Sequence, residues 1–202
     1  MYRTIEELEL ALNSKRISAK EIISDATKRG QTFRAHPLGF ISCTLCIEGV
    51  RKVRLHIWPV SGNTAQDERC QIHDHIFEFK SWVLSGTIEN TEYALSETGT
   101  LYSLYSTNYL GDTSILKKST ETVRLTLEKV SQHSQGASYS VPAGRLHETR
   151  RLGSKSAVTL LITKDISLDA PLVIGPLDGP ARYEYVRSAL TQDELFLVAA
   201  GI

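Results

Sequence analysis

Short β-rich runs separated by turn residues fill the sequence from Pro37 to about residue 175, and they constrain the fold more than any other feature. The runs are rich in β-branched and aromatic residues and recur every 8 to 15 residues, roughly. Gly, Pro or Asp stand between them, as at Leu110–Asp112. Because no helical pattern alternates with these runs, they predict an antiparallel sandwich or barrel of about nine strands rather than βαβ units.

Helical patterns stand only at the two ends of the chain. Thr4 and Ser18 are each followed three residues later by Glu, which is the capping-box form, and Gly30 is a natural stop for the second helix. A third capping box at Thr191 predicts a last helix. We therefore divide the chain into an N-terminal helical extension (1–34), a β-barrel (35–176) and a C-terminal tail with a helix (177–202).

The charge balance excludes several classes of partner. The chain has 23 basic and 23 acidic residues, so no overall field draws it to nucleic acid or to an anionic membrane. Its first 16 residues lack the unbroken apolar run of a signal peptide or membrane span. Its three cysteines show no paired pattern, so we expect reduced thiols and a cytoplasmic location. The N-terminal helices are expected to cover a sheet face or to build a homodimer.

Two of the six histidines, His73 and His75, are separated by a single residue at the head of an apolar run. Alternate side chains of a strand share a face, so these imidazoles point the same way and can bind one metal ion. The best candidate for a third ligand is His147, in the stretch GASYSVPAGRLHETR. The pattern predicts a three-histidine metal site.

The spacing around these histidines resembles the two motifs of the cupin family, G(X)5HXH(X)3-4E(X)6G and G(X)5PXG(X)2H(X)3N. The second motif is matched by Gly136, Pro142, Gly144 and His147, with Arg151 at the final Asn position. The first is matched by His73, His75 and Gly86, with Asp67 at the leading Gly position. The resemblance implies a double-stranded β-helix, or jelly-roll barrel, with the three histidines holding a metal inside. The 49 residues between Gly86 and Gly136 predict an extra hairpin.

The glutamate of the first cupin motif is replaced in this chain. Its position holds Phe79, and Glu78 is one residue off, so Glu78 could be a fourth ligand only if a β-bulge turned it inward. Among cupins, the remaining set resembles the three-histidine thiol dioxygenases and diketone-cleaving dioxygenases. Lys80 stands where the cysteine-specific enzymes have a cross-linking Cys, and residues 159–163 lack their Ser-x-His-x-Tyr relay.

This resemblance implies an Fe(II)-dependent dioxygenase acting on a small polar molecule such as a thiol or carboxylate. A redox-neutral metal enzyme, an isomerase or hydrolase, is the alternative, and so is a cupin that binds a small molecule without catalysis. Imidazole ligands suit Ni, Mn, Zn or Cu as well as iron, so the metal stays open.

Further candidates depend on which strand faces line the barrel. Arg54, His56 and Trp58 share one face of RLHIW. If that face is interior, Arg54 could bind a substrate carboxylate and His56 could act as acid or base. If it is exterior, Leu55 and Ile57 belong to the core, and the apolar run does not decide between the two.

The remaining side chains are assigned to the interior or the exterior from the alternation of strand positions and from the local sequence. Phe77 and Phe79 share the face of His75 and are expected to make the surroundings of the metal apolar. The alternation of side chains along the strand does not decide whether Tyr139 faces the barrel interior or the exterior. Asp74 is expected to face outward, and His36 and His133 stand in polar, turn-like sequence and are expected to be exposed.

Overall fold

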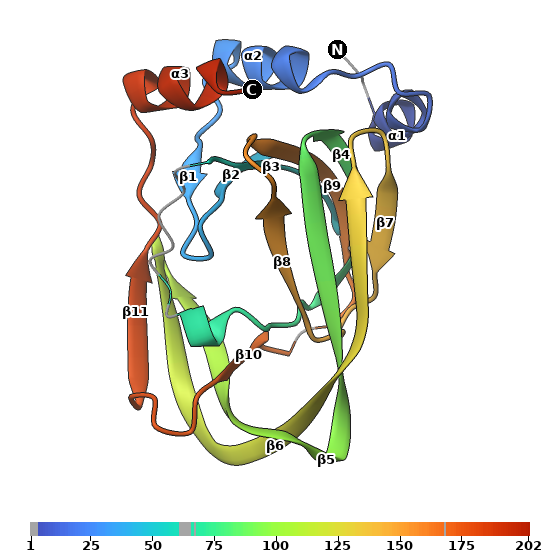
Figure 1. Cartoon of the computed structure of the whole chain (residues 1–202). Helices are drawn as coiled ribbons and strands as arrows, with labels where there is room; N and C mark the ends of the chain where they lie inside the picture. Colours follow the sequence, from blue (N-terminus) through green and yellow to red (C-terminus); the bar gives the residue numbers. More distant parts are fainter. Residues whose placement is uncertain (1–3, 61–65, 67, 168) are drawn as a thin grey trace.

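Two antiparallel sheets form the body of the protein in the computed structural model, which describes residues 4–60, 66, 68–167 and 169–202 (Figure 1). The six-stranded sheet has the order β1-β2-β3-β9-β4-β7, and the five-stranded sheet has the order β10-β5-β6-β11, with β8 also paired to β5. The bounds of the strands of the first sheet are β1 (Arg34–Ala35), β2 (Ile41–Glu48), β3 (Arg51–Trp58), β4 (Phe77–Ser85), β7 (Ser138–Val141) and β9 (Ala157–Asp165). Those of the second are β5 (Thr87–Leu110), β6 (Thr113–Ser134), β8 (His147–Leu152), β10 (Leu172–Gly175) and β11 (Arg182–Val186).

The connectivity is that of a jelly roll. From β7 to β10, consecutive strands alternate between the two sheets: β7 and β9 belong to the first, and β8 and β10 to the second. Strands that cross between facing sheets in this way enclose a space between the sheets. The predicted fold class, mainly β with helices at both ends, is confirmed.

The strand count differs from the prediction because three short strands, β1, β8 and β11, are not marked by β-rich runs in the sequence. In the opposite direction, β5 joins two such runs, residues 87–95 and 100–105, and its pairing with β6 shifts register between Leu95 and Thr100. The extra residues between Gly86 and Gly136 thus form one long hairpin, which runs the length of the barrel in Figure 1. Eleven strands are present in the part of the chain that the structure describes.

The helices α1 (Ile5–Asn13), α2 (Ala19–Lys28) and α3 (Gln192–Ala200) lie together on one side of the barrel (Figure 1). Capping boxes at Ser18 and Thr191 begin α2 and α3, and the hydroxyl of Thr4 accepts a hydrogen bond from the N–H of Glu7 at the start of α1. None of the described helices has both the length and the apolar character needed to cross a membrane.

The main hydrophobic core lies between these helices and the outer face of the six-stranded sheet. Val53, Leu55 and Ile57 of β3 have no exposed surface and pack in one cluster with Ile5 and Leu8 of α1 and with residues of α2 and α3. The alternate residues of β3 therefore face the other way, into the barrel. β3 is therefore covered on both faces, by the helices on one side and by the barrel interior on the other. A short 3-10 helix, η1 (Glu68–Cys70), lies just before His73.

Candidate metal centre

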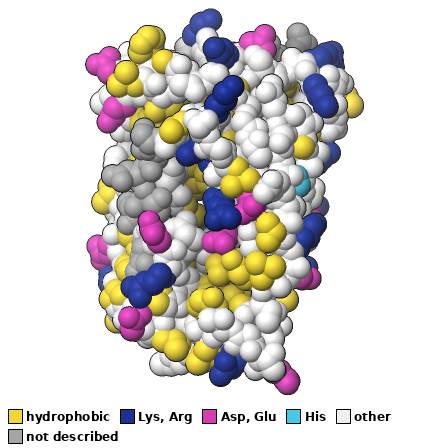
Figure 2. Space-filling view, in the orientation of Figure 1, with side chains coloured by type: hydrophobic (Ala, Val, Ile, Leu, Met, Phe, Trp, Pro, Cys, Tyr) yellow, Lys and Arg dark blue, Asp and Glu magenta, His cyan; other side chains and the backbone are white. Residues whose placement is uncertain are grey.

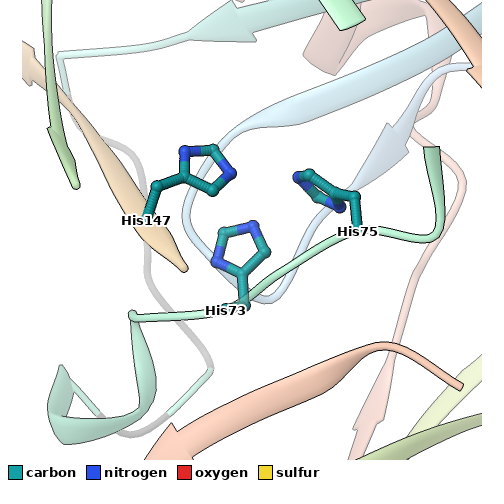
Figure 3. Close-up of side chains that lie close together, drawn as sticks. All are labelled: His73, His75 and His147. Carbon is teal, nitrogen blue, oxygen red and sulfur yellow. The ribbon is translucent and has the colours of Figure 1, made fainter. Parts of the chain in front are cut away.

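Three histidines from two parts of the chain converge inside the barrel (Figure 3). His73 and His75 lie just before β4, and His147 is the first residue of β8. His73 and His147 exchange two backbone hydrogen bonds, each with an N–O distance of 2.9 Å. One nitrogen from each ring lies within 4.8 Å of the corresponding nitrogens of the other two. This spacing suits imidazoles that share one ion, each at about 2.0–2.1 Å from it.

Neighbouring groups determine which ring nitrogens face the common centre. Nδ1 of His73 lies 2.8 Å from the carbonyl oxygen of Gln71, and Nδ1 of His147 lies 2.7 Å from Oδ1 of Asn90. Both oxygens accept hydrogen bonds, so each Nδ1 carries the proton and each Nε2 keeps a free lone pair. Nε2 of His147 is buried and has no hydrogen-bond partner among the described residues.

The three rings are uncharged in this environment. Burial lowers the pKa of His73, and burial together with the neighbouring histidines lowers the pKa of His75 and of His147 well below the ordinary value. Neutral imidazole is the form that binds metal ions. The orphaned, buried Nε2 of His147 and the neutral donor set therefore fit a divalent metal ion.

The turn before β8 ties His147 to His75. The N–H of Gly144 donates to the carbonyl oxygen of His75 at 2.9 Å, and Gly144 has a φ of +72°, which favours glycine. Gly86 has the same φ, and a Cβ there would lie 2.5 Å from the carbonyl oxygen of Ser156. Both motif positions favour glycine because of their positive φ, and Gly86 also because a Cβ would clash with the neighbouring backbone. Asp67, at the leading Gly position of the first motif, lies outside the described residues.

Phenylalanines surround the histidines. The ring of Phe77 stacks on His75, with centroids 4.4 Å apart and planes at 13°, and Phe79 lies 5.7 Å from both His75 and His147. Glu78 points outward instead: its side chain is 52% exposed and lies 3.8 Å from Lys164. Glu78 is therefore not brought to the three histidines.

A cavity of about 810 Å³ opens from the histidines between the two sheets. Arg54, His56 and Trp58 line it, so the face of β3 that the sequence left undecided is the interior one. The guanidinium carbon of Arg54 lies 4.7 Å from the ring centroid of Phe77. The ring of Phe77 thus contacts both this guanidinium and His75. Arg54 Nε is buried and lacks a hydrogen-bond partner among the described residues.

Aromatic rings form the cavity wall beyond Arg54. Phe40 stacks on His36 at 4.2 Å and contacts His56 at 4.4 Å and Trp58 at 4.6 Å. Burial and the charge of Arg54 lower the pKa of His56 to about 3, so this imidazole is neutral. The sequence predicts an exposed His36, but this residue lines the cavity because the turn at Pro37 folds it over Phe40.

Tyr139 and Asp74 complete the surroundings. Tyr139 lines the cavity, contacts Phe79 at 6.0 Å and stacks on His133, and burial raises its pKa to about 12. His133, expected to be exposed, is half-buried by this stacking. Asp74, expected to face outward, is half-buried and lines the cavity. Its Oδ1 accepts a hydrogen bond from the N–H of Leu172 at 2.6 Å, which connects the start of β10 to the segment of His73 and His75.

Sequence reasoning missed two residues of this region. Asn90 lies in the long β5, where nothing marks its contact with a histidine 57 positions away. Arg187 lies in the predicted tail beyond the barrel, yet it lines the cavity, because β11 pairs with β6. Only the pairing of distant strands brings these side chains to the site.

Comparisons with known proteins do not assign this chain to a family. Neither the protein-family models nor the curated proteins include a match to this chain. Among solved structures, a chain from "Crystal structures of DMSP lyases RdDddP and RnDddQII" is similar, with a TM-score of 0.36 and 14% identity, over 65% of this chain and 51% of that one. The match spans about half of that structure, and so remote a likeness indicates no activity. The two-sheet barrel and the three-histidine group fit the cupin resemblance seen in the sequence.

Proposed function

We propose that this protein is a metal-dependent cupin enzyme, an Fe(II) dioxygenase whose substrate is a small molecule with a carboxylate. The observation that carries the proposal is the environment of His147: a neutral imidazole whose buried Nε2 has no partner among the described residues and lies within reach of His73 and His75. A buried nitrogen without a partner is costly, and a metal ion would satisfy it.

His73, His75 and His147 would hold the ion. When bound, iron in such a site supplies Lewis acidity and O2 chemistry, because three neutral ligands leave its charge uncompensated and leave positions open. Phe77 and Phe79 exclude water from the side of the histidines that they cover. The substrate would enter the cavity and lie between the histidines and the opposite wall.

Arg54 would orient the substrate. Its guanidinium is half-buried, faces the cavity, and has an unused Nε donor. A guanidinium with free donors binds a carboxylate by two parallel hydrogen bonds. Since Arg54 and His75 both contact Phe77 and both line the cavity, a carboxylate held by Arg54 would leave the rest of a small substrate beside the three histidines.

A redox-neutral metal enzyme is the second candidate, and His56 favours it. This neutral imidazole faces the cavity and makes ring contacts with Phe40, but no hydrogen bond to any described residue is present. It could exchange a proton with a substrate held by Arg54 on the same strand face. Isomerisation or hydrolysis with zinc, nickel or manganese would use such a group.

Metal content per chain tests both candidates. Wild type, His147→Ala and a matched control, His133→Ala, are purified without added metal or chelator and measured by mass spectrometry. Near-stoichiometric iron that only His147→Ala loses supports the dioxygenase, and O2 uptake with candidate carboxylates follows. Zinc, nickel or manganese lost in the same way supports the redox-neutral enzyme. A metal content that is low and unchanged in His147→Ala contradicts both and leaves a binding barrel.

A further inference from the structure

Two of the cationic side chains in the cavity wall lack a carboxylate partner. Four cationic side chains line the cavity: Arg34, Lys52, Arg54 and Arg187. Arg34 is paired with Asp112 at 2.9 Å, and Lys52 with Asp165 at 2.7 Å. Neither Arg54 nor Arg187 forms an ion pair with any described residue, although the charge of Asp165, which pairs with Lys52, also acts on Arg54. The wall therefore carries two positive charges without a direct carboxylate partner.

Arg187 is held in place by groups that leave its charge intact. Its Nε donates to the hydroxyl of Ser114 at 2.7 Å, and its guanidinium carbon lies 4.7 Å from the ring centroid of Tyr109. Its backbone N–H donates to the carbonyl oxygen of Asp112 at 2.8 Å. Ser114 and Tyr109 are uncharged, so they orient the guanidinium without neutralising it, and its remaining N–H groups stay available for a ligand.

The two guanidinium groups line the same cavity, where their like charges act against each other. Burial lowers the pKa of Arg54, and the charge of Arg187 lowers it further, whereas Tyr109 and Asp165 act in the opposite direction. The same Arg187 charge is also the strongest of those that lower the pKa of His36. Two like charges in a partly buried cavity are unfavourable unless an anion lies between them or beside each.

Asp74, the second carboxylate in the cavity wall beside Asp165, does not offset these charges. Asp74 lies beside His73, and its Oδ1 is used by the N–H of Leu172. A further unused donor is present, however: the hydroxyl of Thr107 lines the cavity, is only 7% exposed and has no partner among the described residues. Thr107 and Tyr109 are on the same face of β5, so this hydroxyl lies on the Arg187 side.

We propose that the cavity binds a dianionic small molecule of the dicarboxylate class, with Arg54 and Arg187 each holding one carboxylate. The inference rests on the proposed function for the site at Arg54 and adds a second anion site at Arg187. The two arginines come from opposite sheets, Arg54 from β3 and Arg187 from the end of β11, and each lies on a different aromatic ring. Two separate anchors in one cavity suit two separate anionic groups.

Isothermal titration calorimetry tests the inference on the full chain. Succinate, glutarate and adipate are each compared with the monocarboxylate of the same carbon number. At least one dicarboxylate is expected to bind about tenfold or more tightly than its matched monocarboxylate, the gain expected from one further charged hydrogen-bonding site. Arg187→Gln should remove this preference and leave monocarboxylate binding unchanged, whereas Arg54→Gln should weaken both.

Control variants separate binding from folding. Arg182→Gln, which removes an exposed β11 cation paired with Glu184, should leave every affinity unchanged. Arg187→Lys keeps the charge and should keep part of the preference. The absence of a preference for any of the three dicarboxylates would overturn the inference. So would an equal loss for both ligand types in Arg187→Gln, because both arginines would then hold one anionic group.

Metal content distinguishes this inference from the proposed function. His147→Ala is expected to lose the metal and to keep the dicarboxylate preference, since neither arginine contacts that side chain. A wild-type protein without metal that still prefers dicarboxylates would end the metalloenzyme proposal and support the anion site. A metal-loaded protein that does not prefer dicarboxylates would overturn the anion site at Arg187 and support the metalloenzyme proposal.

Discussion

Nδ1 of His147 donates to Oδ1 of Asn90 at 2.7 Å, and this hydrogen bond turns the other ring nitrogen toward His73 and His75. Thr149 donates to the same Oδ1 at 3.2 Å, which holds the amide in that orientation. The geometry of the candidate metal centre therefore depends on Asn90, a residue that does not itself face the ion.

Asn90→Leu is expected to weaken metal binding about 10- to 100-fold, because the imidazole loses the acceptor that fixes its tautomer. Asn90→Asp keeps an acceptor at the same position and should bind metal at least as well as the wild type. Competition with a chromophoric chelator measures both affinities. Equal losses in the two variants would show that the amide nitrogen, not the oxygen, faces His147.

Removal of metal should lower thermal stability only when the three-histidine group is intact. A ligand that binds the native state alone stabilises it by about 2.7 kcal/mol at a free concentration of 100 Kd. We expect a chelator to lower the Tm of the wild type and to leave that of His147→Ala unchanged. Scanning calorimetry with and without chelator checks this, and a chelator effect of the same size in both proteins would contradict it.

Arg54→Met should stabilise the protein while it weakens carboxylate binding. The substitution removes a buried donor that has no partner among the described residues, and such a group costs about 1–3 kcal/mol. Urea unfolding measures the gain. Arg51→Met on the same strand is the control, since Arg51 pairs with Glu6 at the surface and should change stability by less than about 1 kcal/mol. A loss of stability in Arg54→Met would mean that its charge has a structural partner.

Truncation of a side chain on the outer face of β3 should lower the free energy of unfolding far more than truncation of an exposed side chain. Leu55 is completely buried against the helices, so Leu55→Ala is expected to cost about 2–5 kcal/mol through the cavity it leaves. Leu95→Ala removes the same atoms from a side chain that is 74% exposed and should cost little. Chemical unfolding of both variants tests the difference, and similar values would contradict the packing of the helices on this sheet.

His56 should make stability fall in mild acid. Its pKa is about 3 in the folded state and 6.5 as the ordinary value, so the unfolded chain binds the proton more readily. The stability it contributes is complete above about pH 6.5 and decreases as the pH falls, by about 2 kcal/mol at pH 5. His56→Gln should lack this part of the pH dependence. Unfolding free energies of the two proteins at pH 7 and pH 5 give the comparison; a constant difference would show that His56 titrates normally.

Local patterns were sufficient for much of this molecule. The capping residues Ser18 and Thr191 determine where helices begin, and the HxH spacing at His73 and His75 places both rings on one side, because both features act within a few residues. Pro142 and Gly144, which match the second cupin motif in the sequence, act equally locally in the turn before His147. These parts of the fold and site could be predicted from the sequence.

Features that depend on long-range pairing could not be predicted. RLHIW has apolar and polar residues that both become covered, and only the packing of α1 and α2 on Leu55 assigns Arg54 to the interior. The contact of Asn90 with His147 needs the pairing of β5 with β8, and the position of Arg187 needs that of β11 with β6. Register between distant strands is determined by the assembled core rather than by a local motif.

Because β3 is covered on both faces, its odd-numbered and even-numbered positions have different roles. Val53, Leu55 and Ile57 maintain the scaffold, whereas Arg54 and His56 line the cavity. Trp58 also lines the cavity but belongs to a buried hydrophobic cluster as well. A mutational library restricted to positions 54 and 56 would therefore vary ligand preference while most of its members still fold. In this barrel, residues for ligand choice and residues for folding are interleaved along one strand.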